Sequence, residues 1–386
     1  IFVVMILGLG AGAFMLRQAA IAEVVIGAKT VSTGANGPKL SAWLDAPGGI
    51  VVDANGDLYV ADSNNDVIVR AEASTTRKAS APVAVVGISG KTGFSGDNGP
   101  ALKAQLDTPD GVCIAPDGDL VVADSHNDRI RRIDKPTRVV TTVAGSGNNG
   151  YDGDEKPATE AALNTPSAVA CAPNGDIYIA DTLNYRVRVV DARTGLIHTV
   201  AGDGSPGDND DIGDYGPAVS AHLNMPADVQ LAPNGDIYIA DTHHNRIRKV
   251  NPVSHLIMTV AGSGTFGPGG DDGPAISANL AAPSGIAIVP EGGGAVSIFI
   301  ADYYNQQVRA VGPDGIMRNV SDEGHVAFGT PSRVAFALSG PWRGWLYVTD
   351  SSKDRVIAVN IPKTSSGPIL APRPLAPGVP AKRPAA

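Results

Sequence analysis

The chain has few cysteines, few aromatic residues and few charged residues for its length of 386 residues. Two cysteines cannot cross-link a chain of this size, which excludes a scaffold built on disulfides. Charged residues make up 18% of the sequence, and the net charge is −9. Because nucleic-acid binding is driven by clustered lysine and arginine, this balance argues against a nucleic-acid partner. Glycine (46) and proline (29) are abundant, which predicts many tight turns.

An uncharged apolar run over residues 1–16 predicts a hydrophobic α-helix in residues 1–22. Three interpretations stay open: a secretory signal, a membrane anchor, and an assembly helix like that of a type IV pilin. The spacing of Gly8 and Gly12 gives the helix a small-residue face suited to close helix contact. Pilins usually carry glutamate at the fifth position, where this chain has Met5. A signal peptide would begin with a basic region, which is missing here.

The other end of the sequence, residues 362–386, is rich in proline and carries lysine and arginine. This composition predicts an extended, polyproline-like tail. One interpretation is a flexible linker. The other is a basic strap that lies on an acidic neighbour.

A motif recurs six times between these two ends. Each copy starts at a proline, contains a tight turn such as Asn174-Gly175, and ends at an aspartate. The copies start at Pro47, Pro109, Pro166, Pro226, Pro283 and Pro331 and end at Asp62, Asp124, Asp181, Asp241, Asp302 and Asp350. Their spacing exceeds the roughly 40–45 residues of common propeller repeats. The excess falls in one long loop of each repeat.

Each copy predicts four antiparallel strands. In the copy that begins at Pro166, the strands after the first are expected at 177–181, 186–190 and 198–201. The third alternates with a period of two, which predicts apolar side chains inward and arginines outward. One such sheet cannot bury both faces alone, so six radial copies predict an all-β, six-bladed β-propeller.

The segments 166–190 and 226–250, which share the sequence Asn-Gly-Asp-Ile-Tyr-Ile-Ala-Asp-Thr, resemble the NHL repeat. The resemblance extends over roughly residues 24–360 and implies an NHL-type propeller in residues 23–361. NHL propellers include RNA binders, receptor ectodomains, scaffolds and a few enzymes, so the resemblance implies a fold rather than a function.

The start of the propeller region matches the end of a repeat. Residues 24–27 and the segment that follows them resemble residues 199–226. We therefore expect 24–27 to form the outer strand of the sixth blade, paired with residues 355–360. Val24 and Ile26 would then join the hydrophobic helix to the ring.

Four long loops, at 94–109, 146–166, 203–226 and 263–283, are expected on one face. They carry Asp97, Asp107, Asp152, Asp154, Glu155, Glu160, Asp203, Asp208, Asp210, Asp211, Asp214, Asp271 and Asp272. This predicts an electronegative face. Its densest part, which includes Asp208, Asp210, Asp211 and Asp214, is a candidate calcium site, although the same residue types also form ordinary turns. No other cofactor is expected.

Arginines follow the repeated aspartates by five or seven residues, as Arg186 and Arg188 follow Asp181. This spacing predicts structural ion pairs within or between blades. His126, His243 and His244 occupy turns and are expected to be exposed. A zinc lyase is known among NHL-like propellers, but these histidines come from non-adjacent blades.

The cysteines and the predicted central channel offer little further chemistry. Cys113 stands four residues after its proline and Cys171 five, so they face opposite sides of their strands and no disulfide is expected. Six-bladed lactonases place carboxylates and amides in the channel. The residues after the repeat prolines, Gly48, Asp110, Ser167, Ala227, Ser284 and Ser332, do not suggest such a cluster.

Together these features favour a non-catalytic extracellular protein with a structural, adhesive or binding role. It would display an NHL propeller on a hydrophobic helix, as a pilin-like filament subunit that self-associates through the helix and the basic tail. The membrane is a second expected contact, and the acidic face could bind a protein or a glycan. The alternatives are an exported or membrane-anchored enzyme of the lactonase or lyase type, and a soluble ligand-binding module.

Overall fold

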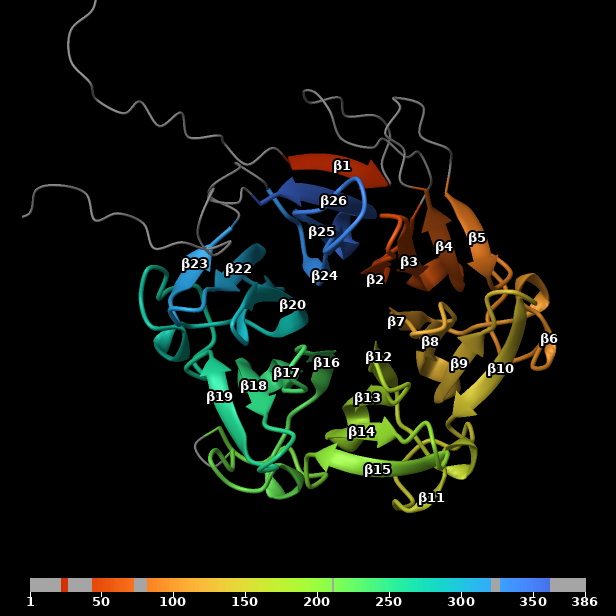
Figure 1. Ribbon diagram of the computed structural model, residues 1–386, viewed down its shortest axis with the longest axis horizontal. Coiled ribbons are helices and arrows are strands. Elements are labelled where there is room, and N and C mark those ends of the chain that lie inside the picture. Colours follow the sequence, from red (N-terminus) through yellow and green to blue (C-terminus); the bar gives the residue numbers. More distant parts are fainter. Residues whose placement is uncertain (1–21, 27–43, 73–81, 210–211, 321–326, 362–386) are drawn as a thin grey trace, which may run out of the picture.

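The computed structural model describes residues 22–26, 44–72, 82–209, 212–320 and 327–361. They form a ring of six antiparallel sheets arranged as the blades of a propeller (Figure 1). The prediction of an all-β, six-bladed propeller is confirmed. Helices in the described part are 3₁₀ turns of three residues, and none of them is long and apolar enough to cross a membrane.

The strands follow the repeat. Blades 1 and 2 contain β2 (Pro47–Val52), β3 (Leu58–Asp62), β4 (Val67–Ala71), β5 (Val83–Val86), β7 (Pro109–Ile114), β8 (Leu120–Asp124), β9 (Arg129–Ile133) and β10 (Val139–Ala144). Blades 3 and 4 contain β12 (Pro166–Cys171), β13 (Ile177–Asp181), β14 (Arg186–Val190), β15 (Leu196–Ala201), β16 (Pro226–Leu231), β17 (Ile237–Asp241), β18 (Arg246–Val250) and β19 (Ile257–Ala261). Blades 5 and 6 contain β20 (Pro283–Gly292), β21 (Ala295–Asp302), β22 (Gln307–Val311), β23 (Met317–Asn319), β24 (Pro331–Phe336), β25 (Trp345–Asp350), β26 (Arg355–Asn360) and β1 (Ala22–Ile26).

Short elements connect the blades. The strands β6 (Gly99–Pro100) and β11 (Lys156–Pro157) add a fifth strand to blades 2 and 3. The 3₁₀ turns that link second to third strands are η1 (Ser63–Asn65), η3 (Ser125–Asn127), η5 (Thr182–Asn184), η7 (Thr242–His244) and η9 (Ser351–Lys353). The loops before blades 2 to 5 contain η2 (Ala101–Lys103), η4 (Ala158–Glu160), η6 (Ala218–Ser220) and η8 (Ala275–Ser277).

The ring closes as the repeat comparison predicted. Strand β1 is the outer strand of blade 6 and pairs antiparallel with β26, with Val24 opposite Ile357 and Ile26 opposite Val356. Pairing strands from the two ends of the propeller covers the edge that β26 would otherwise present. The predicted helix with Gly8 and Gly12, and the tail 362–386, lie outside the described residues.

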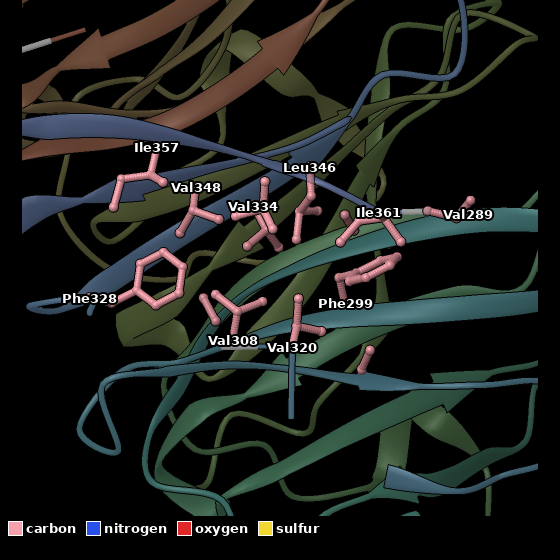
Figure 2. Packing of buried hydrophobic residues seen from close by; sticks show 14 residues of the cluster. Val289, Phe299, Val308, Val320, Phe328, Val334, Leu346, Val348, Ile357 and Ile361 are labelled. Carbon is pink, nitrogen blue, oxygen red and sulfur yellow. The ribbon is translucent and has the colours of Figure 1, made fainter. Parts of the chain in front are cut away.

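The core consists of apolar layers between neighbouring blades. Figure 2 shows the layer between blades 5 and 6, to which Phe299, Val308 and Val348 contribute buried side chains. The rings of Phe299 and Phe336 stack with their centroids 5.6 Å apart. Because each blade buries both faces in this way, stability rests on contacts between blades.

A series of hydroxyl groups also ties each blade to the next. Ser125 Oγ donates a hydrogen bond to the Pro166 carbonyl at 2.7 Å. Thr182 Oγ1 and Thr242 Oγ1 donate in the same way to the first prolines of the following blades, at 2.9 and 2.8 Å. In blades 1 to 4 the hydroxyl after the repeat aspartate therefore positions the next inner strand.

The cysteines form a disulfide, and the prediction that they stay free is wrong. Cys113 on β7 is bonded to Cys171 on β12, the inner strand of the next blade. The registers confirm that the two residues occupy different repeat positions, since Cys113 lies opposite Val121 and Cys171 opposite Ile177. Around the ring, however, one face of each blade packs against the opposite face of the next blade. Side chains on opposite faces are thus the ones that meet, and both cysteines join the layer between blades 2 and 3.

Candidate functional site

One face of the ring, here called the loop face, is formed by the loops before blades 2 to 5 and the 3₁₀ turns that contact them. Asn127 and Asn184 on these turns, and Asn305 on the turn between β21 and β22, donate hydrogen bonds to the carbonyls of Gly93, Gly150 and Gly267 in the loops. These contacts, at 2.7–2.9 Å, place the turns and the long loops on the same face, as the sequence predicted.

Each of blades 2 to 5 contains a buried arginine held between two aspartates. One aspartate ends the second strand, and the other comes from the loop that precedes the blade. The four groups are Asp124–Arg131–Asp97, Asp181–Arg188–Asp154, Asp241–Arg248–Asp214 and Asp302–Arg309–Asp271. We call each of them an arginine staple. The predicted structural ion pairs are therefore present in these blades.

Arg188 illustrates the geometry. Its Nη1 lies 3.3 Å from Asp181 Oδ2, and its Nη2 lies 2.7 Å from Asp154 Oδ1 and 3.0 Å from the Gly153 carbonyl. The guanidinium is fully buried, which corrects the prediction that the arginines of the third strand point outward. A buried charge is tolerated here because two carboxylates and a carbonyl surround it.

Burial also affects the strand-end aspartates. It raises the pKa of Asp124, Asp181 and Asp302 to about 6, against the opposing influence of the arginine and of backbone and asparagine hydrogen bonds. These carboxyls have a structural role, because each is buried within its own blade and binds the arginine and the asparagine or backbone groups around it.

The staples change the expected charge of the loop face. Four of its acidic side chains, Asp97, Asp154, Asp214 and Asp271, are bound to the buried arginines. A prediction based on counting acids therefore overstates the negative potential. These carboxylates fix the loops instead of being presented to a partner.

The loop with the candidate calcium site, at 203–226, is also fixed by an arginine staple. Asp214 accepts a hydrogen bond from Arg248 at 2.8 Å, which commits one of its oxygens. Asp210 and Asp211 lie outside the described residues, and Asp208 is exposed. Within the described ranges, no three His, Cys, Asp or Glu side chains are grouped so that they could hold a metal ion.

The turn histidines differ from one another. His126 and His243 are exposed, as expected. His244 is buried, which corrects that prediction, and its Nδ1 lies 2.9 Å from Asp241 Oδ2. It occupies the position of Asn127 and Asn184 in the other blades, and like those asparagines it contacts the strand-end aspartate.

Exposed aromatic rings gather on the loop face at blade 5. Phe266 comes from the loop before the blade, and Tyr304 from the turn between β21 and β22. Their ring centroids are 6.0 Å apart, and Tyr303 packs edge-on against Tyr304 at 5.0 Å. Phe266 and Tyr304 are 62% and 63% exposed, so this pair presents a large apolar surface to solvent.

The central channel contains a charged cluster that the sequence analysis missed. Arg333 on β24 reaches across the ring, and its Nη2 lies 2.8 Å from Asp110 Oδ2 on β7. The same guanidinium donates to the carbonyls of Ser167, Ala227 and Ser284, at 3.2, 3.1 and 2.5 Å. One side chain thus links the inner strands of five blades at the loop-face end of the channel.

Asp228 completes this cluster from β16. Its carboxylate accepts hydrogen bonds from the Ile286 and Val229 amides, and burial raises its pKa to about 6 despite the nearby Arg333 charge. Asp228 and Arg333 occupy the second position after their repeat prolines, where the other blades have Gly49, Gly111, Ala168 and Gly285. Extending the comparison of repeats by one residue would have found them. Gly285 is required there, since a Cβ would lie 2.7 Å from the Arg333 Cα.

Comparison with known proteins supports the repeat assignment. The family model described as Teneurin NHL domain matches residues 28–134 and 140–191, and the model described as NHL repeat matches residues 223–250. The Arabidopsis thaliana protein SUPPRESSOR OF QUENCHING 1, chloroplastic, is 28% identical over 72% of this chain and 31% of its own length. Bos taurus NHL repeat-containing protein 2 is 29% identical over 65% of the chain and 38% of its own length. Danio rerio Teneurin-3 is 28% identical over 77% of the chain and 11% of its own length.

Solved structures show the same architecture. An auxiliary nutrient binding protein from Bacteroides ovatus has a TM-score of 0.61 at 16% identity, over 88% of this chain and 76% of that one. A gluconolactonase from Xanthomonas campestris has a TM-score of 0.54 at 14% identity, over 83% and 87%. Such distant likeness establishes the fold only. The chain spans less than two fifths of each of the three curated relatives. The repeated motif, the six-bladed ring and the matching family models all lead to the same conclusion: the chain belongs to the NHL-repeat β-propeller family.

Proposed function

We propose that this chain is an exported, non-catalytic propeller that binds a protein partner on its loop face. The observation that carries the proposal is the exposed pair of Phe266 and Tyr304. Tyrosine and phenylalanine are enriched at the centres of protein interfaces, where they supply a large contact area with few rotatable bonds.

The aromatic pair is held in place before any partner binds. Asn305 Nδ2 donates a hydrogen bond to the Gly267 carbonyl at 2.9 Å, which ties the turn carrying Tyr304 to the loop carrying Phe266. The Arg309 staple fixes the same loop through Asp271 and the Gly269 carbonyl, at 2.6 and 3.0 Å. A surface ordered in advance loses less conformational entropy on binding, which favours recognition.

Export is supported by the disulfide between blades 2 and 3. Disulfides persist in oxidising compartments and are rare in the cytosol. The likeness to teneurin propellers agrees with a surface location, although those proteins are far longer than this chain. Membrane anchoring and self-association through residues 1–22 and 362–386 remain predictions. Sedimentation of the full chain and of a chain lacking residues 1–17 tests them, since only the full chain should assemble.

The enzyme alternative depends on the loop-face end of the channel, where Arg333 binds Asp110 and the carbonyls of three inner strands. In this arrangement both Nη atoms of Arg333 are bonded to Asp110 and to strand carbonyls, which ties the ring together. We therefore assign these contacts a structural role and no catalytic one. Steady hydrolysis of glucono-δ-lactone by the full chain would contradict a purely non-catalytic function.

Binding of the fluorescently labelled chain to intact cells of the source organism tests the proposal. We expect saturable binding that weakens at least tenfold in the double variant Phe266→Ala/Tyr304→Ala. Tyr215→Ala is the matched control, because Tyr215 is 73% exposed and lies outside the aromatic pair. Protease treatment of the cells should abolish binding, whereas loss after glycosidase treatment alone would indicate a glycan ligand. Equal binding by the double variant and the wild type would overturn the proposal.

A further inference from the structure

The end of the channel opposite the loop face opens into a cavity of about 330 Å³. Its walls are the ends of the inner strands; the side chains that line it are mostly aliphatic or aromatic, and polar groups contribute the rest of its surface. The aliphatic and aromatic side chains include Val52, Ile114, Leu231, Ile288, Phe336 and Leu338. Leu338 is 53% exposed at the rim, so the cavity opens to solvent. Its volume lies at the lower end of the range for small-molecule sites.

Charged side chains lie next to this cavity. A second cavity of about 20 Å³ is lined by Asp228, Gln230 and Arg333. Gln230 and the apolar residues Ile50, Val112, Val169 and Val334 line both cavities, so the two lie next to each other. The smaller space has room for about one water-sized group.

Arg333 leaves one hydrogen-bond donor unused at this smaller cavity. Its two Nη atoms bind Asp110 and strand carbonyls, whereas its Nε is buried and has no hydrogen-bond partner among the described residues. The side chain is 91% buried, taken from its exposed fraction of 9%. A buried donor without a partner is destabilising, and a bound acceptor would remove that cost.

We propose that this channel binds a neutral amphipathic molecule, with a hydroxyl group at the Arg333 end and an aliphatic chain in the larger cavity. A hydroxyl oxygen can accept a hydrogen bond from Arg333 Nε while its proton is donated to a carboxyl oxygen of Asp228. A hydroxyl has both functions in the volume of one water molecule. The aliphatic chain would lie at the end of the channel opposite the loop face, so the site is distinct from the surface proposed for the protein partner.

The charges around the smaller cavity favour a neutral head group. Asp110 already neutralises the Arg333 guanidinium at 2.8 Å, and Asp228 adds a second carboxyl. A carboxylate head would be repelled by Asp228, and an ammonium head would face Arg333. The aliphatic and aromatic side chains of the larger cavity would favour an alkyl chain, because covering its surface removes apolar area from water.

Isothermal titration calorimetry of the full chain with 1-octanol, octanoate and octylammonium at pH 8 tests the inference. We expect 1-octanol to bind saturably with one site, and each charged analogue to bind at least tenfold more weakly. Saturable binding of octanoate equal to or tighter than that of 1-octanol would overturn the assignment of a hydroxyl head group, as would the absence of saturable 1-octanol binding.

Two leucine variants locate the site. Leu338→Trp places a larger side chain at the rim of the cavity and should weaken 1-octanol binding at least tenfold. Leu102→Trp, at a leucine of similar exposure in η2 of the loop before blade 2, should change it by less than twofold. If both variants bind 1-octanol as the wild type does, the ligand lies elsewhere and the inference is wrong.

Discussion

Blades 2 to 5 and blades 1 and 6 solve the same packing problem with different side chains. In blades 2 to 5 the third strand buries an arginine between two aspartates. In blades 1 and 6 the equivalent positions hold Val69 and Ile357, which join the apolar layers beside them. The polar arrangement is thus dispensable for building a blade, and in blades 2 to 5 it anchors the long loop that precedes the blade.

The repeat itself supports this conclusion. The loop aspartate of the staple lies in the motif Gly-Asp-x-x-Pro, as at 96–100 and 153–157. Before blade 1 the corresponding sequence, at 34–38, has Ala35 in place of the aspartate. Blade 1 therefore lacks the loop aspartate and the arginine together, which indicates that the two residues act as a unit.

The largest expected effect follows from removing one arginine. Arg188→Val gives blade 3 the side chain that Val69 provides in blade 1, but it leaves Asp181 and Asp154 without their cation. Breaking a buried pair in this way costs about 3–5 kcal/mol. Urea unfolding at pH 7 measures this loss of stability. A loss below about 1 kcal/mol would show that the staple contributes little.

The double variant Arg188→Val/Asp154→Ala tests whether the staple is a unit. It gives blade 3 the pair of residues found in blade 1, a valine on the third strand and an alanine in the preceding loop. Residues in direct contact do not act additively, so its destabilisation should be smaller than the sum of the two single losses by at least about 0.5 kcal/mol. Strict additivity would contradict the coupling inferred from the repeats.

The disulfide distinguishes blades 2 and 3 from the rest, and its removal should have the next largest effect. Cys113→Ala/Cys171→Ala opens a link between residues separated by 58 positions. Cross-links of this span typically stabilise by about 2–4 kcal/mol. Urea unfolding of this variant should match that of the wild type in reductant. Equal stability of the oxidised and reduced wild type would contradict a stabilising role.

The sequence was sufficient for the architecture because the fold repeats. Six copies of one motif defined the blades, and the match between residues 24–27 and 199–202 revealed the closing strand β1. The buried Arg188 was not predicted, because strand periodicity alone places charged residues toward solvent. The disulfide and the Arg333 cluster were missed for another reason. Both join different blades, and their geometry depends on how blades face one another around the ring.

A smaller effect concerns pH. Burial raises the pKa of Asp62 in blade 1 and of Asp181 in blade 3 to about 6, so both blades should respond alike. The folded chain then binds more protons than the unfolded chain between about pH 4 and 6. These carboxyls therefore contribute most to the free energy of unfolding below pH 4, and that contribution is lost as the pH rises through 6. The stability advantage of the wild type over Asp181→Asn should therefore shrink from pH 4 to pH 6.5 in urea unfolding, and so should its advantage over Asp62→Asn. An advantage that grows with pH would mean that the pKa is lowered.

The central claim is that the arginine staples fix the loops of the loop face. Hydrogen–deuterium exchange of the Arg309→Val variant tests this claim most directly. Arg309 donates to Asp271 and to the Gly269 and Asn279 carbonyls of the loop that carries Phe266. We predict that amides at 263–280 exchange at least tenfold faster than in the wild type, while those of β2 and β3 in blade 1 keep their protection. Unchanged exchange at 263–280 in a folded variant would contradict the account.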